Sequence, residues 1–245
     1  MAPSKTKLAA WFPTAQSPVV ISAPMLGVSN GTLSAHVSKA GGIGMIPGGF
    51  DFTPGNPQLD TLAKELEAAR AILDASASAG PGPGQAQPYL PVGVGFILSQ
   101  PGVAHFEVDG IPLLQRYGVP AAWLFAPDPA MRLPGSDETP QHLVIAALRR
   151  AGIAAFVQVG TVSAARQAVE DGADAIVAQG VDAGGHQFAR GAGVVSLVPE
   201  VRTMLEDEFA DREVVLLAAG GIVDGRGVAA ALALGTWLTP ASSPC

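Results

Sequence analysis

Short apolar runs recur along the chain, and most of them are separated by segments in which apolar residues fall three and four positions apart. The runs have the length of strands, and their lack of polar positions hints at strands that are buried on both faces. The intervening spacing is that of one face of an α-helix. The predicted strands cover residues 19–23, 42–46, 92–97, 121–125, 155–159, 175–178 and 214–218.

Helix start and stop signals punctuate the segments between these runs. Ser29 or Asn30 is a candidate N-cap for a helix that ends near Gly41, and Pro140 predicts a helix start. Asp224 is a candidate N-cap for the last helix, which ends at Gly235. Strands that alternate with helices in this way predict a parallel sheet.

The predicted strands number one fewer than the eight of a (β/α)₈ barrel, a fold that typically takes ~250 residues as a single unit. After Gly235 the sequence offers residues 236–239 as a short eighth strand and then 240–245, with no eighth helix. We therefore expect one α/β domain over residues 1–245, a TIM-type (β/α)₈ barrel that is incomplete at the eighth βα unit. Either the sheet keeps an open edge, or a neighbouring copy completes it in a homo-oligomer.

Two segments depart from the pattern. Residues 75–88 are biased to Gly, Pro, Ser and Ala and predict a flexible surface loop within the domain. Residues 236–245 form an atypical tail.

Composition narrows the class of protein. The chain is 48% hydrophobic and 14% charged, which permits a large core, and its net charge of −7 without a Lys/Arg run argues against nucleic acid as a partner. The single cysteine, Cys245, allows no internal disulfide and no thiolate metal cluster. Residues 1–11 lack a signal-peptide core, and Asp224 and Arg226 interrupt the most apolar stretch. We expect a cytoplasmic protein without a membrane span.

The active site of a parallel barrel lies where the strands end at their carboxyl side. These ends are glycine-rich and nearly uncharged, and they offer no carboxylate pair, no Ser or Cys nucleophile beside a histidine and no metal-binding spacing. A mouth so poor in reactive groups predicts that a cofactor supplies the chemistry. The predicted mouth comprises residues 23–25, 47–49, 96, 158, 179–186 and 219–221.

Two features of this mouth have both a functional and an ordinary interpretation. His186 follows Asp182 and two glycines at a strand end, which favours a functional role over that of a surface-loop histidine. Gly220 and Gly221 follow the seventh strand just before a helix start, where a phosphorylated cofactor such as FMN binds in many barrels. An isolated Gly-Gly pair is also typical of a tight turn, and on these residues alone the turn is the favoured interpretation.

Five separate segments together resemble the nitronate monooxygenase family, formerly called 2-nitropropane dioxygenases. The resemblance runs in consistent order from about residue 17 to about residue 235. The block at 178–186 is its most specific part. The segments read SAPM at 22–25, SKAGGIG at 38–44, VGTV at 159–162, AQGVDAGGH at 178–186 and AAGGIVDGR at 218–226.

This resemblance implies an FMN-bearing barrel that oxidises alkyl nitronates with O₂ to carbonyl compounds and nitrite. It further implies a histidine beside the flavin, here His186, as the base that takes a proton from a neutral nitroalkane. The implied cofactor residues fall into three groups: Ala23, Pro24 and Met25 along the isoalloxazine; Gln158, Gln179, Ala183, Gly184 and Gly185 near it; and Gly220 and Gly221 at the phosphate.

The sequence departs from the family pattern in two places. Many bacterial relatives carry an asparagine on the third strand where this chain has Gly95. The resemblance also stops near Gly235, so we expect a chain truncated relative to the family. Two alternatives to the nitronate monooxygenase hypothesis are a flavin-dependent enoyl-thioester reductase and a catalytically silent fragment.

Overall fold

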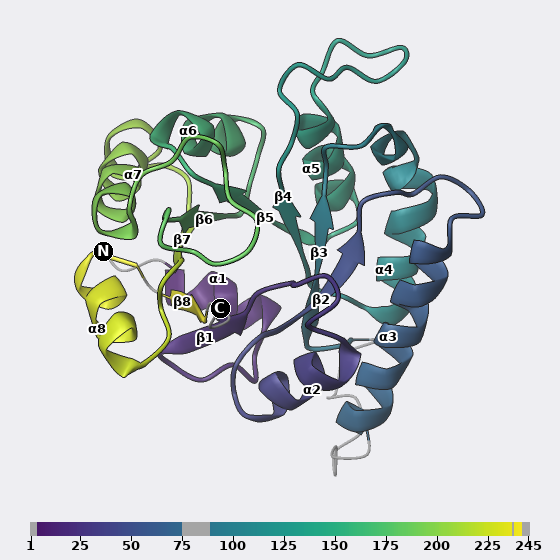
Figure 1. Ribbon diagram of the computed structural model, residues 1–245, viewed down its shortest axis with the longest axis horizontal. Coiled ribbons are helices and arrows are strands. Elements are labelled where there is room, and N and C mark those ends of the chain that lie inside the picture. Colours follow the sequence, from purple (N-terminus) through teal and green to yellow (C-terminus); the bar gives the residue numbers. More distant parts are fainter. Residues whose placement is uncertain (1–3, 75–88, 237, 242–245) are drawn as a thin grey trace.

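A single parallel sheet of eight strands forms the centre of the molecule (Figure 1). The computed structural model describes residues 4–74, 89–236 and 238–241. Each predicted strand is present, with bounds that differ from the expected ones by at most three residues. The strands are β1 (Val19–Ser22), β2 (Gly44–Gly49), β3 (Val92–Ile97), β4 (Ala121–Phe125), β5 (Ala154–Val159), β6 (Ala175–Gln179), β7 (Val215–Ala219) and β8 (Leu238–Ala241).

The sheet closes into a barrel, so the expectation of an open edge at the eighth strand is wrong. β8 pairs in parallel with all four residues of β1 and, at Leu238, with β7. On its other side β1 bonds to the segment before β2: Ser22 N donates to Ile43 O, and Ile43 N donates to Val20 O. β8 lies two residues further along the chain than expected. The closed sheet removes the reason to invoke a neighbouring copy. No helix follows β8 within the described residues, which end at Ala241.

The helices begin and end largely where the sequence predicts. Asn30 caps α2 through Leu33 N, Thr139 caps α5 just before Pro140, and Asp224 caps α8. α6 and α7 lie side by side over the outside of the sheet (Figure 1). The helices are α1 (Ser4–Trp11), α2 (Gly31–Lys39), α3 (Pro57–Asp74), α4 (Ile111–Tyr117), α5 (Pro140–Arg150), α6 (Val162–Glu170), α7 (Val194–Glu208) and α8 (Gly225–Ala233), with the short helices η1 (Pro101–His105) and η2 (Phe106–Gly110).

Alternate residues of the strands β1 to β7 point into the barrel and out toward the helices. In β5, Phe156 belongs to the inner apolar cluster, whereas Val157 and Val159 pack outward against the helices. β4 follows the same pattern, with Trp123 inside and Leu124 outside. Because both faces are covered, the strands carry the continuous apolar runs that the sequence shows.

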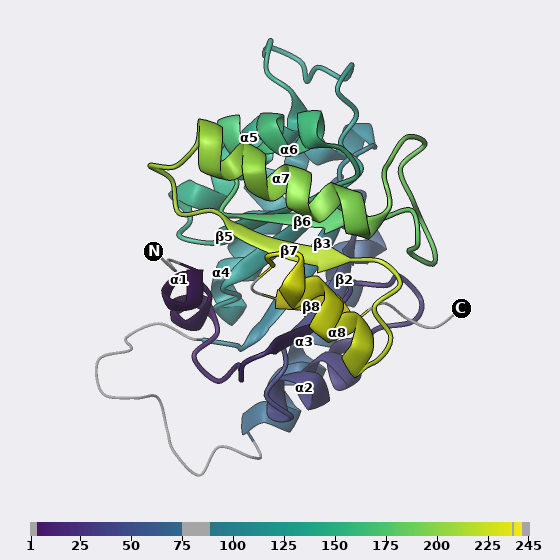
Figure 2. The ribbon, with the colours of Figure 1, turned by 90° about the vertical axis from the view of Figure 1, so that its left-hand side faces the viewer.

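The amino end of the barrel is closed by α1, which the sequence did not predict. Leu8 and Phe12 are buried in the inner cluster, and the Trp11 ring packs 5.4 Å from that of Phe156. Lys7 Nζ donates to Glu213 O at 2.7 Å, and Tyr89 Oη donates to the Trp11 carbonyl at 2.9 Å. Figure 2 shows α1 at one end of the barrel, far from the loop that follows β6. The amino end of the barrel interior is therefore filled by apolar side chains.

The predicted flexible loop at 75–88 lies outside the described residues. Within the part of the chain that is described, none of the helices combines the length and the apolar character that a membrane crossing requires.

Candidate active site

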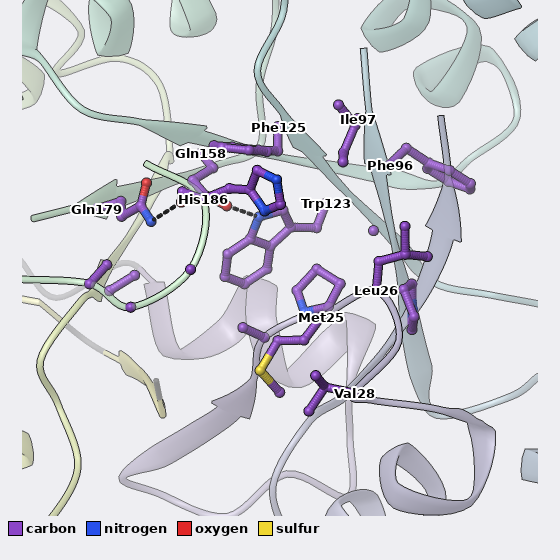
Figure 3. A pocket seen from close by; sticks show the side chains of 18 of the residues that line it. Met25, Leu26, Val28, Phe96, Ile97, Trp123, Phe125, Gln158, Gln179 and His186 are labelled. Atoms are coloured by element: carbon purple, nitrogen blue, oxygen red, sulfur yellow. Dashed lines mark hydrogen bonds between the residues drawn. The ribbon is translucent and has the colours of Figure 1, made fainter. Parts of the chain in front are cut away.

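A cavity of about 440 Å³ opens at the carboxyl end of the barrel (Figure 3). It collects residues from the ends of β1, β5, β6 and β7, which are far apart in the sequence. Every site residue predicted from the sequence lines this cavity except Gly221. Those that line it are Ala23, Pro24, Met25, Gln158, Gln179, Ala183, Gly184, Gly185, His186 and Gly220.

Apolar side chains that were not predicted from the sequence form much of the remaining cavity wall. Leu26 and Val28 come from the loop after β1, and Trp123 and Phe125 come from β4 (Figure 3). The signal that could have found the β4 pair is the period of two along a strand, which places residues 121, 123 and 125 on one face. Leu26 and Val28 are 59% and 63% exposed, so the rim of the cavity is apolar and open to solvent.

Gln158 is held in one orientation by Trp123. The indole Nε1 donates to Gln158 Oε1 at 2.7 Å, as the dashed line in Figure 3 shows. An indole N–H is only a donor, so the amide must turn its oxygen toward Trp123 and its nitrogen away. Trp123 is 2% exposed and packed in the inner cluster, so its indole cannot move away from the amide.

Gln179 is held in the opposite orientation. Its Nε2 donates to the backbone carbonyl of His186 at 3.1 Å, which ties the middle of the loop that carries the histidine to the end of β6. Its Oε1 is buried and has no hydrogen-bond partner among the described residues. An unpaired buried acceptor is costly, by about 1–3 kcal/mol, and calls for a donor that the protein itself does not supply.

The loop between β6 and α7 carries His186 and is tied down along its length. Asp182 Oδ2 accepts from Val194 N at 3.1 Å, at the start of α7. Gln187 Nε2 donates to the Ala183 carbonyl. The Phe188 ring meets the Phe125 ring edge-on at 5.1 Å. These contacts hold the backbone on both sides of His186 while its imidazole stays exposed at the rim of the cavity.

The loop after β1 forms the facing wall. Met25 N donates to Ser29 Oγ at 2.8 Å, and Ser29 Oγ donates back to Met25 O at 3.2 Å, so the turn is closed on itself. The Pro24 ring fills the space beside Gly95, where an added Cβ would lie 2.3 Å from Pro24 Cβ. The proline ring therefore occupies the room that a side chain at residue 95 needs.

Gly220 and Gly221 form the turn after β7, and both have positive φ, +105° and +68°. At Gly220 an added Cβ would lie 2.9 Å from the Gly180 carbonyl oxygen, so the position requires glycine for two reasons. Gly221 does not line the main cavity. It borders a second one of about 280 Å³ between the starts of α7 and α8, which Gly220 also lines.

The amino end of α8 already holds a carboxylate. Asp224 Oδ1 accepts from the backbone N–H groups of Arg226 and Gly227, and Oδ2 accepts from the Arg226 guanidinium. The side-chain hydrogen bond from Arg226 lowers the pKa of the Asp224 carboxyl below its ordinary value, with the Gly227 N–H contributing. Because this helix start is already occupied by a carboxylate, the glycine turn before it is the better candidate for a phosphate site.

The three remaining histidines lie outside the cavity. His36 is on α2 and His105 ends η1. His142 is on α5, where its Nδ1 lies 3.5 Å from Asp171 Oδ1. His186 is therefore the one titratable side chain that lines the cavity among the described residues.

Comparison with known proteins adds independent information. A family model described as nitronate monooxygenase matches residues 135–237. A nitronate monooxygenase from Neurospora crassa is 52% identical over 234 residues, which cover 94% of this chain and 60% of that protein. The chain spans about 60% of the length of the curated relatives it matches most strongly.

Two solved structures share the fold over nearly the whole chain. FabK from Thermotoga maritima is 27% identical, with a TM-score of 0.69 and coverage of 96% of this chain and 60% of that one. A nitroalkane oxidase from Streptomyces ansochromogenes is 27% identical, with a TM-score of 0.66 and coverage of 96% and 66%. The family model and the Neurospora relative show that this chain is similar to nitronate monooxygenases over most of its length, and the two solved structures show that it shares their fold.

Proposed function

We propose that this chain is the FMN-binding barrel of a nitronate monooxygenase, an oxidoreductase that converts alkyl nitronates and O₂ into carbonyl compounds and nitrite. The observation that carries the proposal is the convergence of the family's motif residues on one cavity, with His186 at its rim. The 52% identity to the Neurospora nitronate monooxygenase supports the same reaction class. We further propose that residues 1–245 form a single cytoplasmic domain.

The residues present fit a flavin. A flat ring system suits a cavity whose walls are mainly apolar and whose glycine backbone allows close approach. Gln179 Oε1 lacks a donor, and the N3–H of a flavin ring is one. The turn at Gly220 and Gly221 would hold the phosphate, and the second cavity beside it extends the site in that direction. When bound, a flavin supplies the electron acceptor for the substrate and the reductant for O₂.

His186 would act on substrates that arrive as neutral nitroalkanes. A neutral imidazole accepts the proton from the carbon that carries the nitro group, and the product is the nitronate anion. The Gln179 bond to the His186 carbonyl, together with the Asp182 and Phe188 anchors, keeps the histidine at the rim without restraining its ring. A substrate that is already a nitronate needs no such base.

Two measurements on the purified 245-residue chain test the proposal. We expect a flavin absorption spectrum with about one FMN per chain, and O₂ uptake with nitrite release when propyl-2-nitronate is added. A folded, FMN-loaded protein that is inert to nitronates would refute the proposal. Enoyl-dependent oxidation of NAD(P)H by that protein would identify it instead as an enoyl-thioester reductase, and a folded chain that binds no flavin would be a silent fragment.

A further inference from the structure

We propose that Trp123 is a positioning residue that fixes the Gln158 amide with its NH₂ group toward the cavity, where that group donates to a ring carbonyl of the bound flavin. The inference rests on the proposed function, because the flavin is the ligand that the amide would meet. It concerns Trp123, which no motif in the sequence singles out.

Trp123 and Gln158 stand on neighbouring strands and face the same space. β4 and β5 are paired so that Trp123 lies opposite Phe156, and Gln158 is two residues further along β5, on the same inward face. The indole is 2% exposed in the inner cluster, with its Nε1 2.7 Å from Gln158 Oε1. Figure 3 shows both side chains among the residues that line the cavity.

The chemistry of the pair decides which end of the amide reaches the cavity. An indole nitrogen cannot accept a hydrogen bond, so an amide turned the other way would set two donors against each other in a buried site. Oε1 is therefore committed to Trp123. Within the described part of the chain no hydrogen bond engages Gln158 Nε2, so its N–H groups are available to a ligand.

The neighbouring strand end presents the opposite polarity. Gln179 Nε2 donates to the His186 carbonyl, and the buried Gln179 Oε1 has no partner among the described residues. A donor from Gln158 and an acceptor from Gln179 match a ring edge on which a carbonyl stands beside an N–H. The pyrimidine edge of a flavin has this pattern. Without Trp123 the Gln158 amide would be free to turn, and half of this match would be lost.

A double-mutant cycle on the full chain tests whether Trp123 acts through Gln158. Trp123→Phe removes the donor and keeps an aromatic ring, and Gln158→Met removes the amide at similar length. We expect the FMN dissociation constant, measured by quenching of flavin fluorescence, to rise about fivefold in Trp123→Phe and about tenfold in Gln158→Met, in line with the loss of one hydrogen bond. The double variant should match Gln158→Met within about twofold. Effects that multiply would show a merely structural role for Trp123 and overturn the proposal.

A third variant and a ligand-free measurement keep the proposal falsifiable if Trp123→Phe does not fold. Gln158→Glu can still accept from the indole but offers no donor, so its FMN affinity should fall at least as far as that of Gln158→Met, and wild-type affinity would overturn the proposal. In ¹⁵N-labelled protein the Trp123 indole N–H resonance should move upfield in Gln158→Met, and an unmoved resonance would also overturn it. If the wild-type chain binds no FMN, the proposed function fails, while the indole resonance still decides whether Trp123 holds Gln158.

Discussion

The two ends of the barrel are built from the same eight strands but are finished in opposite ways. At the amino end, large apolar side chains fill the interior. They come from Leu8 and Trp11 of α1 and from Phe12, the residue that follows this helix. At the carboxyl end, the strands lead into turns with glycines at positive φ, and a cavity of about 440 Å³ remains between them. One end is closed by side chains and the other is kept open by their absence.

This difference assigns stability to one end and chemistry to the other. Apolar burial at the amino end contributes to folding without placing any constraint on a ligand. The carboxyl end carries the exposed His186, the unpaired Gln179 Oε1 and a turn at Gly220 that only glycine fits. None of these features adds much to stability. Substitutions at the two ends should therefore separate stability from FMN binding and turnover.

The largest expected effect is at the amino end. Phe12 is 1% exposed in the inner cluster, so Phe12→Ala should lower the free energy of unfolding by about 3–5 kcal/mol through lost burial and the cavity it leaves. Urea unfolding monitored by circular dichroism measures the change, and Phe12→Leu is the matched control with a smaller loss. The folded fraction of Phe12→Ala should bind FMN as the wild-type chain does. If that folded fraction bound FMN more weakly, the amino end would also contribute to FMN binding, and the proposed division between the two ends would be wrong.

The second prediction concerns turnover. His186→Asn should lower kcat/KM on a neutral nitroalkane by about 10²–10⁴-fold, the usual contribution of a general base, while FMN stays bound. Because the side chain is exposed, the free energy of unfolding should change by no more than about 0.5 kcal/mol.

Two comparisons control this result. The rate on a preformed nitronate should be little changed in His186→Asn, because that substrate has already lost its proton. His36→Asn, an exposed histidine on α2 away from the cavity, should leave both rates unchanged. Equal rates of His186→Asn and the wild-type chain on the neutral substrate would remove the role proposed for His186.

The third prediction tests the glycine turn. Gly220→Ala places a Cβ 2.9 Å from the Gly180 carbonyl oxygen at a φ of +105°, so it should cost about 1–3 kcal/mol of unfolding free energy and weaken FMN binding. Gly225→Ala is the matched control, because no atom lies within 4 Å of its added Cβ and its φ is not in the positive range. Wild-type affinity in Gly220→Ala would show that the turn does not contact the phosphate.

Most of the fold could be predicted because both faces of the strands are buried, which leaves uninterrupted apolar runs in the sequence. The mouth residues followed from strand ends, since the carboxyl ends of parallel strands meet at one end of a barrel. Gly221 was predicted to line the main cavity because it follows Gly220 in the sequence. Positive φ at both residues turns the chain away from that cavity, and Gly221 lines the second cavity instead.

The parts that could not be predicted depend on contacts between distant residues. α1 reads SKTKLAAW, which has no amphipathic face, and it gains its partners only when the barrel forms. The eighth strand was expected to leave an open edge because the segment predicted for it, 236–239, is short and no eighth helix was predicted after it. Its partner β1 lies more than 200 residues earlier, and that pairing is what makes it a strand. The orientation of Gln158 likewise depends on Trp123, 35 residues away in the sequence.

The smallest expected effect belongs to a charge at the open end. Asp224→Asn keeps an oxygen that can cap α8 but removes the pairing with Arg226, so it should lower Tm slightly at pH 7. The Arg226 hydrogen bond lowers the folded-state pKa of Asp224 below its ordinary value of 3.8. Its contribution is therefore fully present above that value and is lost as the pH falls through the lowered pKa.

The Tm difference between the wild-type chain and Asp224→Asn should accordingly stay constant from about pH 7 to about pH 4.5 and shrink at more acid pH. Because the Arg226 side chain is 93% exposed, added salt should shrink it as well. Differential scanning calorimetry across this pH range measures both dependences. A difference that grows on acidification would mean that Asp224 binds its proton more tightly in the folded chain than in the unfolded one. The carboxylate at the start of α8 would then oppose folding, and the open end of the barrel would carry an electrostatic cost.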